Sequence, residues 1–370
     1  MIRLSLARHS SQGRKRRRVS ADTLLFLSLI VLLQACSSGT SSDNDLAIPC
    51  AGPAEECAAR LAIGGGLYLR YYRSHPLDRR NQEVREALII VHGAGRAAEW
   101  NFETGILASS TMGRLQETAV IAPKFIILED EPAPDEAYWT SNGWKKGHLS
   151  VSDVYRPYRI SSYAVTEQII RILDDESLFP NLQAIVVAGH SAGGQYSHRF
   201  AAGNRVEQEL TGVSIRYVVA NPSTYLYLGL ERVVPGTFDE FAIPDVAACP
   251  DYNVWHYGLE WLNTYMSALT VNQIRNQLVS RNVAIMVGSE DRGTAQLDMS
   301  CGAMLEGANR YFRGLILVNY MDAFWPGHNH TLQIVPGVAH SSRGMFMSDQ
   351  GLEALFLPSP VYALSPLQGS

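Results

Sequence analysis

A serine lies among glycines in the segment GHSAGG, residues 189–194, which directly follows the apolar, β-branched run AIVVA. The pattern G-x-S-x-G between a strand and a helix is typical of a nucleophilic serine held at a sharp turn. Small neighbours are needed because a Cβ beside this serine would crowd the strand or the helix. Ser191 is therefore the predicted nucleophile, and the alternative is a small residue in an ordinary glycine-rich turn.

A serine hydroxyl is a weak nucleophile near neutral pH, so Ser191 needs a base, most often a histidine oriented by a carboxylate. His340 follows the last predicted strand and gives the chain order Ser, acid, His. The alternative reading of His340 is a histidine in a surface loop. His190 belongs to the turn itself, so we expect its ring to point away from the hydroxyl. The other histidines considered lie at strand ends or on the helix after the serine: His92, His198, His328 and His330.

The orienting carboxylate is expected after the apolar run VAIMV, where the sequence continues GSED. Glu290 and Asp291 both end this predicted strand, and Asp298 follows in the same loop. A carboxylate in this place fixes the imidazole tautomer and stabilises the imidazolium. Strand composition alone leaves the choice among the three acids open.

The negative oxygen of a tetrahedral intermediate needs backbone N–H donors aimed at it. We expect one from Ala192, the residue after the nucleophile, and one from the turn HGAG at 92–95, at Ala94. No metal or cofactor is expected. The chain has no Cys-x-x-Cys pair, and the two histidines at 328 and 330 lack acidic neighbours, which indicates a solvated loop.

Elements that could position these residues alternate along the chain, which predicts a mostly parallel sheet covered by helices. We expect a helix at 161–176 with an N-cap serine, one at about 192–202 and a last one at 350–357. The apolar residues of the first helix that should face the sheet are Val165, Ile169, Ile170 and Leu173. Residues 223–280 break the alternation and are predicted to be an insertion, a cap over the sheet edge, with a helix around 259–279. The predicted strands are 67–72, 87–95 ending in glycines, 118–125, 184–189, 214–223 running into a turn, 283–291 with acids at its end, and 330–340 with a histidine in the loop behind it.

Aromatic residues are dense in the insertion and could line an acyl or aryl pocket. They could equally pack the cap onto the core. Trp139 and Trp144, in the loop after an earlier strand, are similar candidates. The named candidates for substrate contact are Trp139, Trp144, Tyr225 and Trp255.

The first 35 residues have the pattern of an export leader, with a basic segment RKRRR and a ten-residue apolar run that is too short to span a bilayer. The run ends in LQAC, which resembles the lipobox of bacterial lipoproteins and predicts a lipid on Cys36. An ordinary cleaved leader with an incidental cysteine is the alternative. Residues 36–60 are predicted to be a polar tether, 61–357 the domain, and 358–370 a Pro-rich tail.

Cleavage before Cys36 would remove seven basic side chains and one Asp, leaving 24 basic against 35 acidic side chains, a net charge of −11. This acidity argues against nucleic acid as a partner. Four further cysteines in an exported chain suit two disulfides. Their proximity in the sequence favours Cys50 with Cys57 and Cys249 with Cys301.

HGAG, GHSAGG, GSED and GVAH occur here in the order seen in the α/β-hydrolase superfamily, which the chain resembles over roughly residues 60–357. The resemblance implies an eight-stranded sheet, metal-independent hydrolysis and the triad Ser191, Asp291 and His340, with Asp291 preferred because G-x-x-D is the family's usual spacing. GHSAGGQYSHRFA looks closest to exported bacterial esterases and polyester depolymerase-like proteins, although HGAG departs from the HGGG of one esterase subgroup.

The leading hypothesis is therefore an exported, membrane-tethered serine hydrolase that cleaves carboxylic esters. A serine peptidase or amidase on the same fold shares the chemistry and is the alternative enzyme. A lipoprotein that only binds ligands on a hydrolase scaffold is the alternative outside enzymes, and it predicts that one member of the triad is lost.

Overall fold

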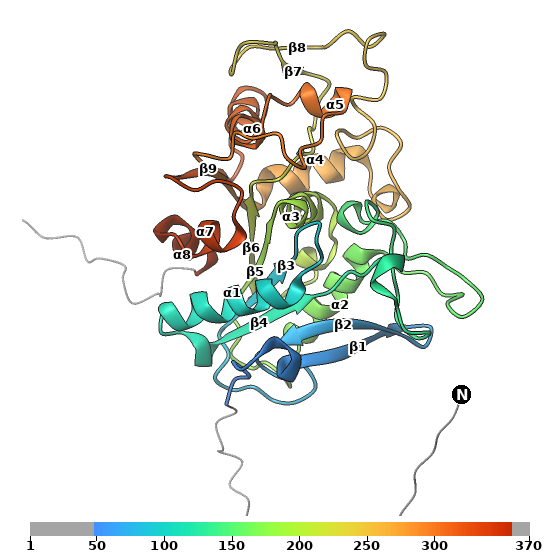
Figure 1. Ribbon diagram of the computed structural model, residues 1–370, viewed down its shortest axis with the longest axis vertical. Helices are drawn as coiled ribbons and strands as arrows, with labels where there is room; N and C mark the ends of the chain where they lie inside the picture. Colours follow the sequence, from blue (N-terminus) through green and yellow to red (C-terminus); the bar gives the residue numbers. More distant parts are fainter. Residues whose placement is uncertain (1–47, 357–370) are drawn as a thin grey trace, which may run out of the picture. The chain divides into compact units, whose positions relative to one another are not determined.

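The computed structural model describes residues 48–356, so the predicted leader, Cys36, most of the tether and the Pro-rich tail lie outside the described residues. Eight strands form one sheet in the order β1-β2-β4-β3-β5-β6-β9-β10 (Figure 1). In this order the strands from β4 to β10 run parallel to one another. At one edge of the sheet β2 is antiparallel to β4, and β1 is antiparallel to β2. The sheet strands are β1 (Ala58–Gly64), β2 (Leu67–Arg73), β3 (Glu86–Val91), β4 (Thr118–Pro123), β5 (Ala184–His190), β6 (Ser214–Ala220), β9 (Asn282–Gly288) and β10 (His330–Val335).

Helices cover both faces of the sheet, and the alternation of side chains along the strands explains why. In β5, Ile185 and Val187 pack in the core beneath one set of helices, whereas Val186 and Ala188 pack beneath the other. The first set comprises α2 (Ser162–Leu173), α3 (Ala192–Gly203), α4 (Val271–Ser280) and α6 (Arg310–Phe324), and the second comprises α1 (Ala98–Thr111), α7 (Ser342–Phe346) and α8 (Asp349–Leu355). Parallel strands covered on both faces are buried along their whole length, as β5 is.

The predicted helix at 161–176 is present as α2, and its start has the expected cap. The Ser161 side chain accepts a hydrogen bond from the Tyr163 amide, which satisfies one of the free N–H groups at the helix start. The four residues predicted to face the sheet are all fully buried: Val165, Ile169, Ile170 and Leu173.

Two predicted boundaries are wrong. The tether was expected to reach residue 60, but a 3-10 turn (η1, Ala54–Cys57) and β1 precede that point, and Ala54 is 1% exposed. This segment folds onto the domain because the Cys50 amide donates to the Ser74 carbonyl and Cys50 is bonded to Cys57. The helix expected at 259–279 begins only at Val271, where Thr270 and Gln273 form a capping box.

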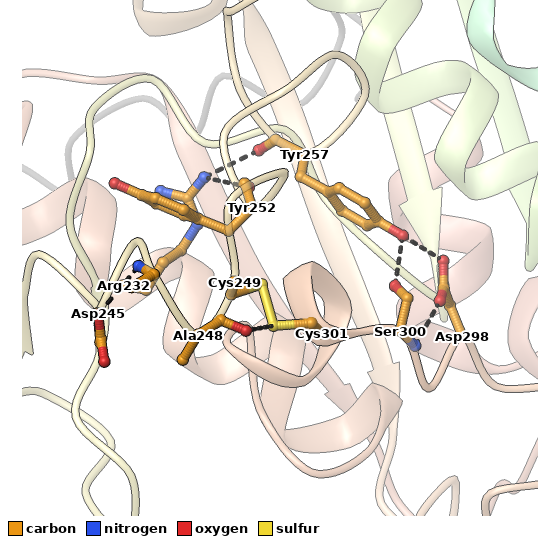
Figure 2. Close-up of a disulfide and its surroundings, with 10 residues drawn as sticks. Arg232, Asp245, Ala248, Cys249, Tyr252, Tyr257, Asp298, Ser300 and Cys301 are labelled. Atoms are coloured by element: carbon orange, nitrogen blue, oxygen red, sulfur yellow. Dashed lines mark hydrogen bonds between the residues drawn. A yellow bond between two sulfur atoms is a disulfide. The ribbon is translucent and has the colours of Figure 1, made fainter.

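The insertion, residues 221–270, lies between β6 and α4 and contains the two-stranded β7 (Arg232–Val233) and β8 (Phe241–Ala242) and the turn η6 (Met266–Ala268). Figure 2 shows the Cys249–Cys301 disulfide, which joins the insertion to the short helix α5 (Cys301–Met304). Both predicted disulfide pairings are therefore confirmed. Within residues 48–356 no helix is both long and apolar enough to cross a membrane.

Candidate active site

Ser191 occupies the turn between β5 and α3 with a strained backbone. Its φ of 58° and ψ of −117° lie in a region that residues with a side chain seldom adopt. Its amide donates to the Ala220 carbonyl at the end of β6, at 2.9 Å. The surrounding structure thus holds the serine at the carboxyl edge of the sheet, where loops from several strands converge.

The glycines around Ser191 are required by close approach of backbones. A Cβ at Gly189 would overlap the Gly193 carbonyl group, and one at Gly193 would lie 2.7 Å from the His92 carbonyl oxygen. A Cβ at Gly194 would lie 2.7 Å from the Ala220 carbonyl oxygen. Each distance is too short for a carbon atom, so a side chain at any of the three positions would force the turn, β3 or β6 to move.

Replacing Gly193 by alanine is expected to lower the free energy of unfolding by about 3 kcal/mol, because its methyl group would press on backbone that cannot move freely. Urea denaturation followed by fluorescence measures this difference. The matched control is Gly293→Ala, because a Cβ there meets nothing within 4 Å. The control should stay within about 0.5 kcal/mol of the parent. Equal stability of the two variants would contradict the packing argument.

The structure brings together the three residues predicted to form the triad. His340 Nε2 lies 3.0 Å from Ser191 Oγ, and His340 Nδ1 lies 2.7 Å from Asp291 Oδ2. Asp291 is 3% exposed and follows β9, and His340 lies in the loop after β10. The geometry allows the imidazole to accept the serine proton while the carboxylate holds its other nitrogen.

Arg310, at the start of α6, is a partner of this carboxylate that the sequence reading missed. Its guanidinium lies 3.5 Å from Asp291 Oδ1, and both side chains are buried. The arginine therefore leaves the other carboxylate oxygen for His340. Nothing in the spacing of residues 291 and 310 indicates this contact, because it depends on how α6 packs beside β9.

The other two acids considered lie apart from the histidine. Glu290 accepts a hydrogen bond from the Ser289 hydroxyl at 3.0 Å and is exposed. Asp298 accepts from the Tyr257 hydroxyl at 2.8 Å and from the Ser300 amide at 3.0 Å (Figure 2). In the described part of the chain, Asp291 is thus the carboxylate bonded to His340.

The turn that carries Ala94 lies against the nucleophile. A Cβ built on Gly93 would be 3.9 Å from the Ser191 Cβ. Ala192 is the first residue of α3, so its N–H has no partner within the helix and can face a ligand. Both predicted donors are therefore next to Ser191, and their action on a substrate oxygen stays a prediction.

His92 fixes the direction of the Ala94 amide. The Phe125 N–H donates to His92 Nε2 at 2.9 Å, so the ring proton is on Nδ1 and is donated to the Gly93 carbonyl, also at 2.9 Å. In a trans peptide the N–H points opposite to the carbonyl, so this bond sets where the Ala94 N–H points. Burial lowers the pKa of His92 to about 4, which keeps the ring neutral and this tautomer in place at neutral pH.

The remaining histidines are bound elsewhere. The His190 ring is buried and packs 4.4 Å from the His340 ring, His198 accepts from the Leu226 amide, and His328 contacts Asp322. His330 begins β10, is buried, and its Nε2 is bonded to the Leu278 carbonyl, so the solvated loop expected at these two histidines is wrong for His330. Among residues 48–356 no group of three or more His, Cys, Asp or Glu side chains is arranged to hold a metal ion.

The aromatic residues chosen as substrate contacts lie in the core instead of on an open wall. Trp139 and Trp144 are 1% and 0% exposed and pack around Phe125, and Tyr225 is 0% exposed. Trp255 is 8% exposed and donates its indole N–H to the Lys146 carbonyl at 3.1 Å. The alternative reading, that these aromatics pack the cap onto the core, fits the structure because large flat rings fill the space between the insertion and the sheet.

The sheet order, the turn at Ser191 and the covering helices define the α/β-hydrolase fold. The chain aligns with poly(aspartic acid) hydrolase-1 from Sphingomonas sp. KT-1 at 22% identity and a TM-score of 0.55, over 80% of this chain and 97% of that one. It aligns with a poly(3-hydroxybutyrate) depolymerase from Bordetella parapertussis at 18% identity and a TM-score of 0.54, over 78% and 86% of the two chains. No family model and no curated protein matches the chain.

Proposed function

We propose that the protein is a serine hydrolase that cleaves carboxylic esters through an acyl-enzyme. The observation that carries the proposal is the continuous chain of contacts Ser191–His340–Asp291, at 3.0 and 2.7 Å, with Ser191 on a strained turn. A protein that only binds ligands would have no need to keep a strained serine in contact with a buried histidine–carboxylate pair.

The proposed reaction starts when His340 Nε2 accepts the hydroxyl proton as Ser191 Oγ attacks the ester carbonyl carbon. The N–H groups of Ala94 and Ala192 donate to the negative oxygen of the tetrahedral intermediate. His340 then gives the proton to the departing alcohol oxygen, leaving an acyl group on Ser191. Water, deprotonated by the same histidine, attacks the acyl carbonyl, and His340 returns the proton to Ser191 Oγ as the bond between this oxygen and the acyl carbon breaks and the acid leaves. Asp291 stabilises the imidazolium in both halves.

A panel of 4-nitrophenyl esters with acyl chains of increasing length tests the proposal, and aminoacyl anilides assayed in parallel test amide cleavage. Poly(aspartic acid) is an amide-linked polymer, so the structural likeness to a hydrolase of that polymer keeps amide cleavage as the second candidate. Faster turnover of anilides than of esters would replace the first candidate by the second. Turnover of neither class would contradict both.

We also propose that the protein is exported and tethered to a bacterial membrane through a lipid on Cys36, as the basic segment, the apolar run and LQAC suggest. Replacing Cys36 by alanine is expected to move the protein from the membrane fraction to the soluble fraction, because the acylated atom is lost. Fractionation of cells and immunoblotting measure this. Thr40→Ala, in the same predicted tether, should leave the distribution unchanged. Continued membrane attachment of the cysteine variant would contradict the tether.

A further inference from the structure

Two consecutive lysines lie beside the candidate active site, and the mechanism above does not use them. They end the 3-10 turn η4 (Trp144–Lys146), which lies between β4 and α2 and packs against α3, the helix that starts after Ser191. The Trp144 ring lies 4.5 Å from the ring of His92, whose bond sets the Ala94 amide. Lys145 and Lys146 thus directly follow Trp144, which packs on the histidine that orients the Ala94 amide.

The insertion holds this turn in place. The Lys146 carbonyl accepts from the Trp255 indole N–H at 3.1 Å and from the Asn263 side-chain amide at 2.7 Å. Between those two residues, the His256 carbonyl accepts from Arg199 Nε of α3 at 3.1 Å, and the Tyr257 hydroxyl donates to Asp298 (Figure 2). The insertion therefore links η4, α3 and the loop after β9 into one wall.

The sheet order places this wall around Ser191. β4 and β9 lie two strands away from β5, on opposite sides of it. Four strand spacings of about 4.8 Å therefore put β4 and β9 about 19 Å apart. Even so, Lys145 lies in the segment after β4 and is attracted electrostatically by Asp298, in the segment after β9. Trp255, which donates to the Lys146 carbonyl, and Tyr257, which donates to Asp298, are two residues apart in the insertion, so this short stretch joins the segment after β4 to the segment after β9.

Positive charge exceeds negative charge in this wall. Lys145 and Lys146 are half-buried, and among residues 48–356 neither ammonium group has a carboxylate within 4.0 Å. Arg199 is fully buried and bonds to uncharged oxygens, among them the His256 carbonyl and the Thr224 hydroxyl. Burying cations without a paired anion is costly, and a bound anion would offset that cost.

A cavity of about 410 Å³ is lined by residues that precede and follow η4 in the chain, and not by the two lysines themselves. Asn263, which holds the Lys146 carbonyl, is part of its lining, together with His148, Arg159 and Thr140, and none of its lining residues is acidic. The protein as a whole has a net charge of −5, so a cavity whose lining includes Arg159 and no carboxylate is a local exception. The exception suits a ligand with a negative charge.

We propose that Lys145 and Lys146 bind a carboxylate of the substrate, so that the esters cleaved at Ser191 are those with a free carboxylate on the acyl or the alcohol part. The proposal rests on the proposed ester hydrolysis. In it, the lysines position the substrate and take no part in proton transfer. The carboxylate accepts hydrogen bonds from the ammonium groups while the ester carbonyl reaches Ser191.

The test compares substrates that differ only in charge, using the full chain. Mono-4-nitrophenyl adipate carries a carboxylate on the acyl part, and methyl 4-nitrophenyl adipate is its neutral match. For the alcohol part, 4-(butyryloxy)benzoate is compared with its methyl ester. In the double variant Lys145→Met/Lys146→Met we expect kcat/KM for the preferred acid to fall about tenfold and that for its methyl ester to change less than about twofold.

Lys124→Met is the matched control, because Lys124 already pairs with Glu99 at 3.0 Å. It should leave the ratio of acid to ester turnover unchanged. Equal losses on acid and ester in the double variant would show a structural role and overturn the proposal. The proposal would also be overturned if the parent protein cleaved each neutral ester as well as its matching acid. A parent protein that cleaves no ester at all would instead overturn the proposed function.

The preference for the acid should also depend on pH. Burial and the nearby Arg199 lower the pKa of both lysines to about 8, against the attraction of Asp298, and Lys145 further lowers the pKa of Lys146. The lysines are charged below this pKa, so the ratio of kcat/KM for acid and ester should be highest below pH 8 and fall as the pH rises through about 8. His148 and His256 also face this region, and burial lowers the pKa of each below its usual value, so neither gains charge above neutral pH. A ratio that is flat from pH 7 to pH 9 would contradict the proposal.

Discussion

Replacing Ser191 by alanine is expected to lower kcat for a 4-nitrophenyl ester by about 10⁶-fold, because the variant has no oxygen to form the acyl-enzyme. Any remaining turnover would come from the backbone donors and the bound geometry alone. The side chain makes one hydrogen bond, to His340, so the fold should survive its loss. Steady-state assays, with the free energy of unfolding measured in urea, separate a chemical loss from a structural one.

Ser197→Ala is the control for this variant. Ser197 lies on α3, the helix that starts after Ser191, is fully buried, and its hydroxyl has no hydrogen-bond partner among residues 48–356. Its replacement should leave kcat within about twofold of the parent, because the same hydroxyl is lost at a residue that takes no part in the proposed reaction. If Ser191→Ala kept more than about a hundredth of the parent activity, the assignment of the nucleophile would be wrong, since loss of a nucleophile costs far more.

The second large effect is expected at Asp291. Replacing it by asparagine should lower kcat about 10⁴-fold, because an uncharged amide does not stabilise the imidazolium and can hold His340 in the wrong tautomer. The change also leaves the buried Arg310 without its charged partner at 3.5 Å. The measurement is kcat against pH on the neutral ester, with stability recorded alongside.

Glu290→Gln is the matched comparison, since it makes the same chemical change one residue earlier in the same loop. Glu290 is exposed and its carboxylate accepts from the neighbouring Ser289 hydroxyl, so turnover should stay within about twofold of the parent. A large loss in Glu290→Gln together with near-normal turnover in Asp291→Asn would reverse the choice between the two acids.

Local pattern predicted the sheet and the helix beside it well. The apolar run before Ser191, the N-cap at Ser161 and the buried face of α2 are all short-range features, and each appears in the structure where expected. The loop residues at strand ends came together for a general reason. Parallel strands bring their carboxyl ends to one edge, so Ser191, Asp291 and His340 had to lie near each other once the strands were right.

The remaining features of the fold and the site depend on long-range packing, so they could not be predicted from the sequence. The helices α1 and α6 were not predicted, because their apolar side chains do not follow a single face. In the insertion, a helix was expected to start near 259, but Trp261 has a φ of 51° and the chain turns there. Arg310, Lys145 and Lys146 could not be found from spacing, because each meets its neighbours through an element distant in the sequence.

The most direct test of the central claim is labelling with a fluorophosphonate, in which the activated serine oxygen displaces fluoride and keeps the phosphonyl group. Mass spectrometry of the intact chain and of its peptides then locates the adduct. We expect one adduct per chain, on the peptide that contains Ser191, and none in the Ser191→Ala variant. An adduct on a different residue, or an unlabelled parent protein that still cleaves esters, would contradict it.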